Sequence, residues 1–322
     1  MLLAPALAGP PAGAAEKLVG IYSAGAIAQS PPWIAQHAGL FAKHDLAFEL
    51  KFIASSSMGT AAMLSGEAEV GVVGSVGIVH AVTKGATDLV FIGAMKNVLT
   101  HSILARPEIR APADLKGKKI GVTRFGSNSH YFTVQVARRL GLEPGRDFTF
   151  IQSGGEPEAL AALTGGSIDA ASLSPPVDAR AIARGFHPVI SGPELRIPYL
   201  AAPFVTRRSV IAQRPQVVGR FMRAIAEAAK ILHTDPELTF TVLARQLRLG
   251  PEDRKALEAS YAAEIKALER RLEIKREALE AVLAEVAQTD PTARGVKADD
   301  LIDRRYLDEM ERSGFFDRLW AK

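Results

Sequence analysis

Short runs of β-branched and other apolar residues alternate with longer stretches of helical periodicity from Lys17 onward. The first set of these runs predicts strands at residues 18–22, 48–53, 69–73 and 89–93. A second set, after Pro112, predicts strands at residues 118–122, 147–151 and 168–173. Because strands that alternate with helices form βαβ units, the pattern indicates α/β structure with mostly parallel sheets.

The starts and ends of the intervening helices are also marked. Pro31 and Pro32 open the first expected helix, which continues through Phe41, and a missing N–H does no harm at a helix start. Residues 55–57 and 127–129 supply N-cap side chains, and Gly141 ends the helix that begins after residue 129. Since both sets repeat the order strand, capped helix, strand, small-residue loop and helix, we expect two similar α/β lobes.

The chain from Gln213 to its end has a helical pattern almost throughout. A helix is expected at residues 215–233, and the charged stretch 252–287 carries apolar residues at near-helical spacing. That stretch has too few clean heptads for a coiled coil, so we interpret it as an amphipathic helix pair packed on a lobe.

Composition and charge narrow the function classes. The 322 residues are 48% hydrophobic and 23% charged, which suits two modest lobes, and no apolar run reaches the roughly 18 residues of a membrane helix. The net charge is +4, but acidic and basic residues are interspersed, which argues against a nucleic-acid partner. The absence of cysteine excludes disulfides, thiolate metal sites and cysteine nucleophiles.

Residues 1–15 contain only Met, Leu, Ala, Pro and Gly. Small residues at positions 13–15 and leucines before them are typical of the end of a signal peptide, although a positive segment is missing. We interpret residues 1–15 as a signal-peptide remnant of a protein exported to the periplasm. The alternative is an Ala/Pro/Gly tail on a cytosolic protein.

Small polar residues gather where the expected strands end. In doubly wound sheets ligands bind at the carboxyl ends of the strands, where hydroxyls and free N–H groups at helix starts hold polar groups. These positions, with Trp33 as a possible stacking residue and His130 as the one histidine near a cleft loop, give the candidate ligand-binding set. The set is Ser23, Trp33, Ser56, Ser57, Ser75, Arg124, Ser127, Asn128, Ser129, His130, Ser153 and Ser174.

Each candidate also has a structural interpretation. Ser57 and Ser127 are equally suited to be plain N-caps, and Trp33 to be a core residue. Acidic residues are scarce among the expected cleft loops, with Glu156 as the main exception, so a cationic ligand is disfavoured. The serines, Arg124 and helix N-termini there favour a carboxylate, a sulfonate or a neutral heterocycle.

Catalytic and metal-binding patterns are weak. The 7 histidines show no metal-ligand spacing, and the chain has no G-x-S-x-G elbow, phosphate loop or G-x-G-x-x-G after its first strand. We therefore predict no catalytic residues, no metal and no cofactor.

Several motifs resemble the nitrate/sulfonate/taurine and thiamine-precursor (SsuA/THI5-like, NMT1-type) family of periplasmic solute-binding proteins. They are PWIA at 32–35 with GLFAKHDL at 39–46, LSGEAEVG at 64–71, DLKGKKIGV at 114–122 and LTGGSIDAA at 163–171. The resemblance implies a type II periplasmic binding fold, with two α/β lobes joined by two crossover hinge strands and a helical C-terminal region. It places lobe I at residues 16–103 and 204–322, lobe II at 104–203, and the crossings near 102–105 and 202–205.

The same resemblance implies a function. It implies a monomeric, non-catalytic receptor of an ABC importer, which closes on one small molecule and delivers it to a membrane permease. The alternative is a cytosolic enzyme of the same fold, of the menaquinone-pathway or pyrimidine-synthase type. The cysteine-rich iron motif of the pyrimidine synthases is missing here.

Overall fold

The computed structural model describes residues 15–321 and contains two five-stranded sheets. In the first sheet β1 pairs in parallel with β2 and β3, while β10 is antiparallel to both β3 and β4. The strands, in the spatial order β2-β1-β3-β10-β4, are Leu46–Phe52, Glu16–Tyr22, Val70–Val72, Pro203–Arg207 and Leu89–Ala94. Strand β10 therefore returns to this sheet after the whole second sheet has been formed.

The second sheet repeats the arrangement. Strand β6 pairs in parallel with β7 and β8, and β5 is antiparallel to both β8 and β9. The strands, in the spatial order β7-β6-β8-β5-β9, are Thr149–Gln152, Lys119–Val122, Ala170–Leu173, Ser102–Ala105 and His187–Ser191. Each sheet thus consists of parallel strands interrupted by one antiparallel strand.

Two segments carry the chain between the sheets. Residues 95–101 lead from β4 to β5, and the chain returns through residues 196–202 to β10. They lie antiparallel, with Leu99 N donating to Ile197 O at 3.0 Å and Tyr199 N donating to Asn97 O at 3.0 Å. The predicted fold class, two α/β lobes joined by two crossing segments, is confirmed. The crossings lie a few residues before the predicted positions, which belong to β5 and the start of β10.

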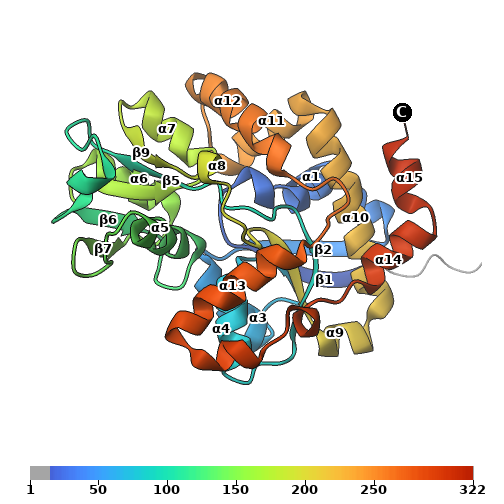
Figure 1. Ribbon diagram of the computed structural model, residues 1–322. Coiled ribbons are helices and arrows are strands. Elements are labelled where there is room, and N and C mark those ends of the chain that lie inside the picture. Colours follow the sequence, from blue (N-terminus) through green and yellow to red (C-terminus); the bar gives the residue numbers. More distant parts are fainter. Residues whose placement is uncertain (1–14, 322) are drawn as a thin grey trace, which may run out of the picture.

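Helices cover the sheets of both lobes (Figure 1). One expected helix is divided into α1 and α2, because Gly39 between them has φ +68°, which ends the first helix. The helices of this part of the chain are α1 (Pro31–His37), α2 (Leu40–Lys43), α3 (Ser56–Ser65), α4 (Ser75–Thr83), α5 (Asn128–Arg139), α6 (Glu156–Thr164), α7 (Val177–Ala183) and α8 (Gly192–Leu195).

The predicted helical C-terminal region is confirmed. It comprises α9 (Arg208–Gln213), α10 (Pro215–Thr234), α11 (Pro236–Leu247), α12 (Arg254–Glu264), α13 (Arg276–Thr289), α14 (Arg305–Arg312) and α15 (Phe315–Trp320). The apolar face of α10 packs on the first lobe, where the ring of Phe221 stacks on Phe41 with centroids 6.0 Å apart. Burial of this face stabilises the helix against the sheet.

The C-terminal region contacts both lobes as well as the crossing. On the way from α12 to α13, Glu269 N donates to Met95 O and Ala94 N donates to Leu272 O, both at 2.8 Å. Asp253, just before α12, pairs with Arg180 of α7 at 3.3 Å. Glu285 of α13 pairs with Arg138 of α5 at 2.9 Å. We expected this region to lie with the first lobe alone, and its contacts also extend to the second.

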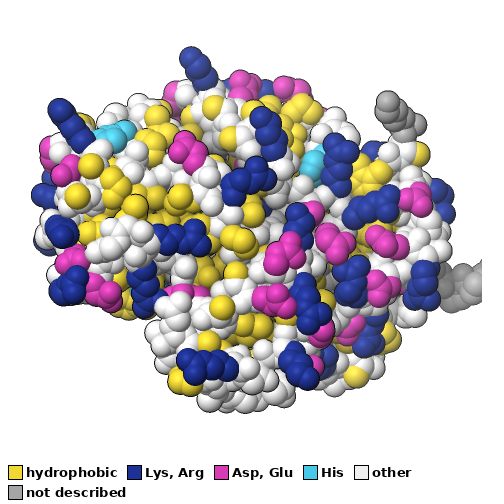
Figure 2. Space-filling model, viewed as in Figure 1, with side chains coloured by type: hydrophobic (Ala, Val, Ile, Leu, Met, Phe, Trp, Pro, Cys, Tyr) yellow, Lys and Arg dark blue, Asp and Glu magenta, His cyan; other side chains and the backbone are white. Residues whose placement is uncertain are grey.

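The surface carries mixed charge. On the face shown in Figure 2, Lys and Arg side chains alternate with Asp and Glu over both lobes, so this face presents no continuous basic stripe. Among residues 15–321, no helix is both long enough and apolar enough to cross a membrane.

Candidate functional site

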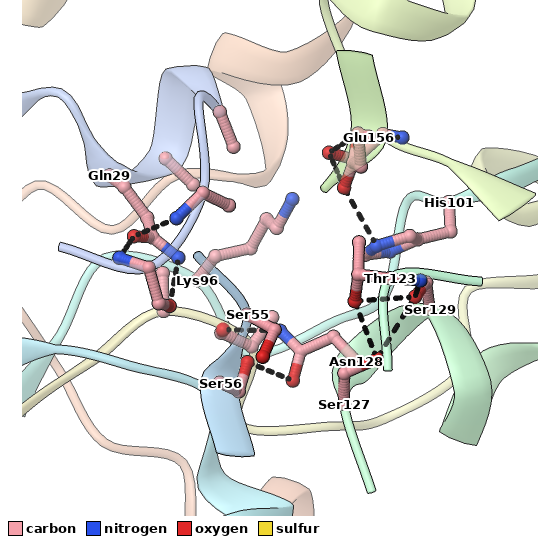
Figure 3. A pocket seen from close by; sticks show the side chains of 17 residues that line it. Gln29, Ser55, Ser56, Lys96, His101, Thr123, Ser127, Asn128, Ser129 and Glu156 are labelled. Atoms are coloured by element: carbon pink, nitrogen blue, oxygen red, sulfur yellow. Dashed lines mark hydrogen bonds and ion pairs between the residues drawn. The ribbon is translucent and has the colours of Figure 1, made fainter. Parts of the chain in front are cut away.

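A pocket lies between the two lobes, at the carboxyl ends of strands from both sheets. Figure 3 shows Gln29, Ser55 and Ser56 on one side and His101, Thr123 and Glu156 on the other, with Lys96 extending between them. The polar residues that line the pocket are Ser23, Gln29, Ser55, Ser56, Lys96, His101, Thr123, Ser127, Asn128, Ser129, Glu156 and Ser174. Alanines 24, 26, 28, 201 and 202 complete the lining.

The enclosed space is small. About 40 Å³ is open to the centres of water-sized molecules, enough for on the order of three waters. In this geometry the pocket suits a ligand with few non-hydrogen atoms.

The first-lobe wall is fixed by Gln29. Its Oε1 accepts hydrogen bonds from Ser23 N at 2.8 Å and Ala24 N at 3.1 Å, and its Nε2 donates to Ser23 Oγ at 3.2 Å. The side-chain amide thereby satisfies two backbone donors of the loop that follows β1. Gln29 holds this loop in place at the pocket.

Ser55 begins the next part of the first-lobe wall. Its Oγ accepts a hydrogen bond from Met58 N at 3.5 Å, so it is the N-cap of α3. Its backbone has φ +73° and ψ 149°, a conformation that glycine adopts readily and other residues seldom do. Such strain is concentrated at functional sites, and here it lies in the lining of the pocket.

The second-lobe wall contains three hydroxyls that bond to one another. Thr123 Oγ1 lies 2.8 Å from Ser127 Oγ and 3.1 Å from Ser129 Oγ, and the two serine oxygens are 3.0 Å apart. Ser127 is also the N-cap of α5, accepting from His130 N at 3.4 Å. The cap interpretation of Ser127 is therefore realised, and its hydroxyl faces the pocket as part of a cluster.

Asn128 joins the lobes to the crossing. Its Oδ1 accepts a hydrogen bond from Tyr199 Oη at 2.7 Å and a longer one from Ser56 Oγ at 3.4 Å, and its Nδ2 donates to Ala201 O at 3.0 Å. A Cβ on Gly74 would lie only 1.9 Å from Asn128 Oδ1, so this approach depends on a glycine there. Asn128 is mainly a contact between the lobes.

Charged side chains occupy the rest of the pocket. The carboxylate of Glu156, at the first position of α6, accepts from Ser174 N and Ser174 Oγ at 2.9 Å and lies 3.5 Å from His101 Nε2. Lys96 Nζ donates to Thr100 Oγ1 at 2.7 Å and forms a buried ion pair with Glu264 of α12. Each charge is therefore compensated by protein groups, as buried charges require.

Half of the twelve sequence-predicted residues come together at this pocket. Those that line it are Ser23, Ser56, Ser127, Asn128, Ser129 and Ser174. They follow β1, β2, β6 and β8, so they lie at the carboxyl ends of strands, which is where ligands bind in doubly wound sheets.

The other six predicted residues lie outside the pocket lining. Trp33 is buried in the first-lobe core against Tyr22, with ring centroids 5.0 Å apart, and Ser75 is fully buried at the start of α4. Ser57 lies in a separate surface groove with His80 and Lys84. The remaining three are in the second lobe. Arg124 is exposed, Ser153 lies beside Gly121, and His130 packs on the rings of Phe125 and Phe150.

Several lining residues were not among the candidates. Ser55 precedes the predicted Ser56, Thr123 precedes the predicted Arg124, and Glu156 had been noted only for its charge. Lys96 and His101 lie on the crossing between β4 and β5, and Gln29 lies in a short 3₁₀ turn after β1. No strand or helix-cap signal marks these last three positions in the sequence. Within residues 15–321, no group of three or more His, Asp or Glu side chains is arranged to hold a metal ion.

Solved structures share this architecture at low sequence identity. A protein of Bordetella bronchiseptica RB50 aligns with a TM-score of 0.81 and 21% identity over 92% of this chain and 97% of its own. The alkanesulfonate-binding protein SsuA of Xanthomonas axonopodis pv. citri, bound to MOPS, aligns with a TM-score of 0.74 and 21% identity over 92% of this chain and all of its own (100%). These neighbours establish the fold.

An enzyme has the same fold. The desulfurization enzyme DszB aligns with a TM-score of 0.70 and 17% identity, covering 92% of this chain and 99% of its own. The fold alone therefore does not separate receptors from enzymes.

Sequence comparison gives the family. A protein of Brucella abortus (strain 2308), named as a candidate binding protein, is 23% identical over 231 residues, which is 67% of each chain. The family model described as "NMT1/THI5 like" matches residues 28–239, well over half of the chain, and this span includes both sheets apart from the first strand. The chain therefore belongs to the NMT1/THI5-like family.

Proposed function

We propose that this protein is the extracytoplasmic solute-binding protein of an ABC importer. The observation that carries the proposal is the composition of the pocket wall. Both lobes and both crossing segments contribute residues to one enclosed polar pocket, so rotation of the lobes about the crossing opens and closes it. A pocket whose walls belong to two lobes suits a receptor that binds a small molecule by closing and releases it by opening.

The ligand class we propose is a small organic anion or heterocycle, such as a sulfonate, a carboxylate or a pyrimidine-like compound. In support, the helices α3 and α5 begin at the pocket, and helix N-termini favour negative charge. The bound MOPS of the Xanthomonas neighbour is itself a sulfonate, which is consistent with this class.

We further propose that the protein acts as an exported monomer, with residues 1–15 as the remnant of its signal peptide. Residues 1–14 lie outside the part of the chain that the structure describes. We also propose lobe I at residues 16–103 and 204–322 and lobe II at 104–203. The strand membership of the two sheets supports this division. The membrane partner is an ABC permease, and no nucleic acid is involved.

An enzymatic function of the DszB or menaquinone-pathway kind is the alternative, and two observations favour the receptor. The DszB neighbour was also solved as a cysteine-to-serine variant with biphenyl-2-sulfinic acid, whereas this chain has no cysteine. In addition, no histidine ring among residues 15–321 hydrogen-bonds to a serine or threonine hydroxyl, as an activated hydroxyl nucleophile would require.

The proposal is tested by thermal-shift screening of the purified protein against sulfonates, carboxylates and pyrimidines. A ligand present at about 100 times its Kd adds about 2.7 kcal/mol to the free energy of unfolding, which is a clear rise in Tm. We expect at least one compound to raise Tm. We also expect the double variant Ser127→Ala/Asn128→Ala to bind it about tenfold more weakly, while Ser65→Ala, on the far end of α3, leaves the affinity unchanged.

Two outcomes would contradict the proposal. Unchanged affinity in the double variant would show that these side chains serve only as caps and lobe contacts. Chemical conversion of the bound compound would show that the protein is an enzyme.

A further inference from the structure

Helix α7 of the second lobe packs against helix α12 of the C-terminal region, and the two lie side by side in Figure 1. Arg180 of α7 pairs with Asp253, just before α12, at 3.3 Å. Immediately before α7, Pro175 O accepts a hydrogen bond from Ile27 N of the first lobe at 3.4 Å. Since these contacts join the second lobe to the rest of the molecule, they must break when the lobes separate.

One carboxylate in this interface has no cationic partner. Asp178, in the first turn of α7, is half-buried, and its Oδ1 accepts a hydrogen bond from Ala179 N at 2.6 Å. Among residues 15–321, no Lys, Arg or His side chain forms an ion pair with it, and Arg180 of the same helix is already paired with Asp253. A carboxylate that is withdrawn from water without a base is costly in its ionised form.

The charged groups that face Asp178 come from three other elements. Glu264 lies on α12, Glu156 lies at the start of α6, and Lys96 lies on the crossing from β4 to β5. The charge of Lys96 is compensated by its buried ion pair with Glu264. Ser174 connects the other two acids, because its O accepts from Asp178 N at 3.1 Å and its N donates to Glu156 at 2.9 Å. Ionised Asp178 would therefore add a third negative charge beside a single lysine.

The remaining neighbours of α7 do not supply the missing base. Strands β5 and β9 also pack on this helix. Strand β5 has no titratable side chain, and β9 has only His187, whose Nε2 lies 2.8 Å from Ile109 O. His101, on the crossing, lies 3.5 Å from Glu156. These two histidines are the other groups near the interface that titrate close to neutral pH.

The closed interface changes the proton affinity of Asp178. Burial, together with the carboxylates of Glu264 and Glu156, raises its pKa from 3.8 to about 7, and the bond from Ala179 N and the charge of Lys96 offset only part of this increase. When the lobes separate, water reaches α7 and Glu264 moves away with α12, so the pKa returns toward its ordinary value. The closed arrangement thus holds a proton that the open one releases.

We propose that closure of the two lobes takes up one proton on Asp178, so that the closed arrangement is favoured in acidic solution and gives way to the open one as the pH rises. This coupling rests on the lobe movement of the proposed receptor and adds a means of regulating it. Between pH 4 and pH 7, uptake of one proton lowers the ratio of closed to open molecules by up to about tenfold for each unit of rising pH.

The test follows the distance between α7 and α12 in the full-length protein without ligand. Because the chain has no cysteine, the double variant Ala183→Cys/Ala259→Cys carries spin labels at two exposed positions only, one on each helix. Pulsed electron paramagnetic resonance gives the populations of the closed and open distances at intervals from pH 5 to pH 8.5. We expect the ratio of closed to open molecules to fall at least about tenfold over this range.

Variants of the labelled protein assign the pH dependence to Asp178. Asp178→Asn is neutral at every pH, so its ratio of closed to open molecules should stay near the value that the unsubstituted protein has at pH 5. The control Glu158→Gln removes a carboxylate at an exposed position of α6 and should keep the pH dependence. Circular dichroism and Tm at both ends of the pH range confirm that the variants are folded.

The outcomes separate this coupling from the proposed function. Distances that do not change with pH overturn the coupling, and so does an undiminished pH dependence in Asp178→Asn, which would assign the titration to His101 or His187. In both cases a compound that raises Tm in the thermal-shift screen leaves the receptor function standing. If Asp178→Asn abolishes the pH dependence while no compound of that screen binds, the coupling stands and the receptor function fails.

Discussion

Ser55 combines backbone strain with a helix cap, and the two effects make opposite demands on its side chain. Its φ of +73° favours glycine, whereas its hydrogen bond from Met58 N favours a hydroxyl. Strain of this kind costs about 1–3 kcal/mol, while replacing a serine cap costs about 1 kcal/mol for alanine and a few tenths for glycine. We therefore expect Ser55→Gly to unfold with a free energy about 2 kcal/mol above that of Ser55→Ala, as measured by urea denaturation.

Ser65, at the other end of α3, supplies the control. Because its backbone is helical, Ser65→Gly should be less stable than Ser65→Ala by up to about 1 kcal/mol. The order of the two variants should thus reverse between the ends of one helix. If Ser55→Gly were the less stable variant at position 55, the strain assigned to this residue would be wrong.

The residues of the pocket differ in how far the sequence could predict them. Ser56 and Ser127 follow strands at helix starts, and parallel strands end at one edge of a sheet, so local pattern brings them to the pocket. His101 and Lys96 lie on a crossing segment, and their position depends on how two sheets, distant in sequence, are placed. Arg124 follows β6 as predicted, but its side chain is exposed and is not among the residues that line the pocket.

At the scale of elements, helix α12 is joined to the crossing by one buried ion pair. The side chains of Lys96 and Glu264 are 5% and 1% exposed. Removing one partner of such a pair leaves an uncompensated buried charge and typically costs about 3–5 kcal/mol, whereas replacing both by apolar residues is often neutral. We expect Glu264→Gln to lose about that much unfolding free energy and Lys96→Met/Glu264→Met to recover most of it.

An exposed pair on the same helix provides the comparison. Arg254 and Glu258 are 40% and 48% exposed and lie one turn apart, so Glu258→Gln should cost less than about 0.5 kcal/mol. Urea denaturation measures the free energy of unfolding of all these variants. Similar small losses for Glu264→Gln and Glu258→Gln would show that the pair does not anchor α12.

Most elements follow from local pattern, and the exceptions depend on distant parts of the chain. The strands at residues 18–22 and 89–93 were predicted nearly to their ends, since alternation and turn residues are local signals. The antiparallel insertion of β10 between β3 and β4 has no such signal, because its partners precede it by more than a hundred residues. Likewise, the charged stretch 252–287 was predicted as a helix pair, but not the hydrogen bonds of its middle to residues 94–95.

At the scale of the whole molecule, several contacts hold the lobes together beside the pocket. Ile27 N donates to Pro175 O at 3.4 Å across the cleft. From the second lobe, Arg180 pairs with Asp253, just before α12, and Arg138 pairs with Glu285 of α13. Lobe opening must therefore break contacts on both flanks of the crossing as well as those of Asn128. A ligand that bridges the two walls favours the closed arrangement by adding contacts that only this arrangement provides.

Two titrating groups in the second lobe link the stability of the molecule to pH with opposite signs. Burial against Phe125 and Phe150 lowers the pKa of His130 from 6.5 to about 4. The unfolded chain therefore takes up this proton first, and stability is lost as the pH falls from about 6.5 to about 4.

Burial, together with the carboxylates of Glu264 and Glu156, raises the pKa of Asp178 from 3.8 to about 7. The unfolded chain releases this proton first, and stability is lost as the pH rises from about 4 to about 7.

Because the two effects cover the same pH range, they largely cancel in the native protein and become visible only when one is removed. Each shift corresponds to a contribution on the order of 3 kcal/mol. Relative to the native protein, His130→Phe should gain stability at pH 4 compared with pH 7, and Asp178→Asn should gain it at pH 7 compared with pH 4. Urea denaturation at intervals from pH 4 to pH 7.5 measures both differences, in which the contributions of the other titrating groups cancel.

If the curves of unfolding free energy against pH for both variants run parallel to that of the native protein, neither group titrates with a shifted pKa. A change of the same sign in both would mean that one of the two shifts is assigned in the wrong direction.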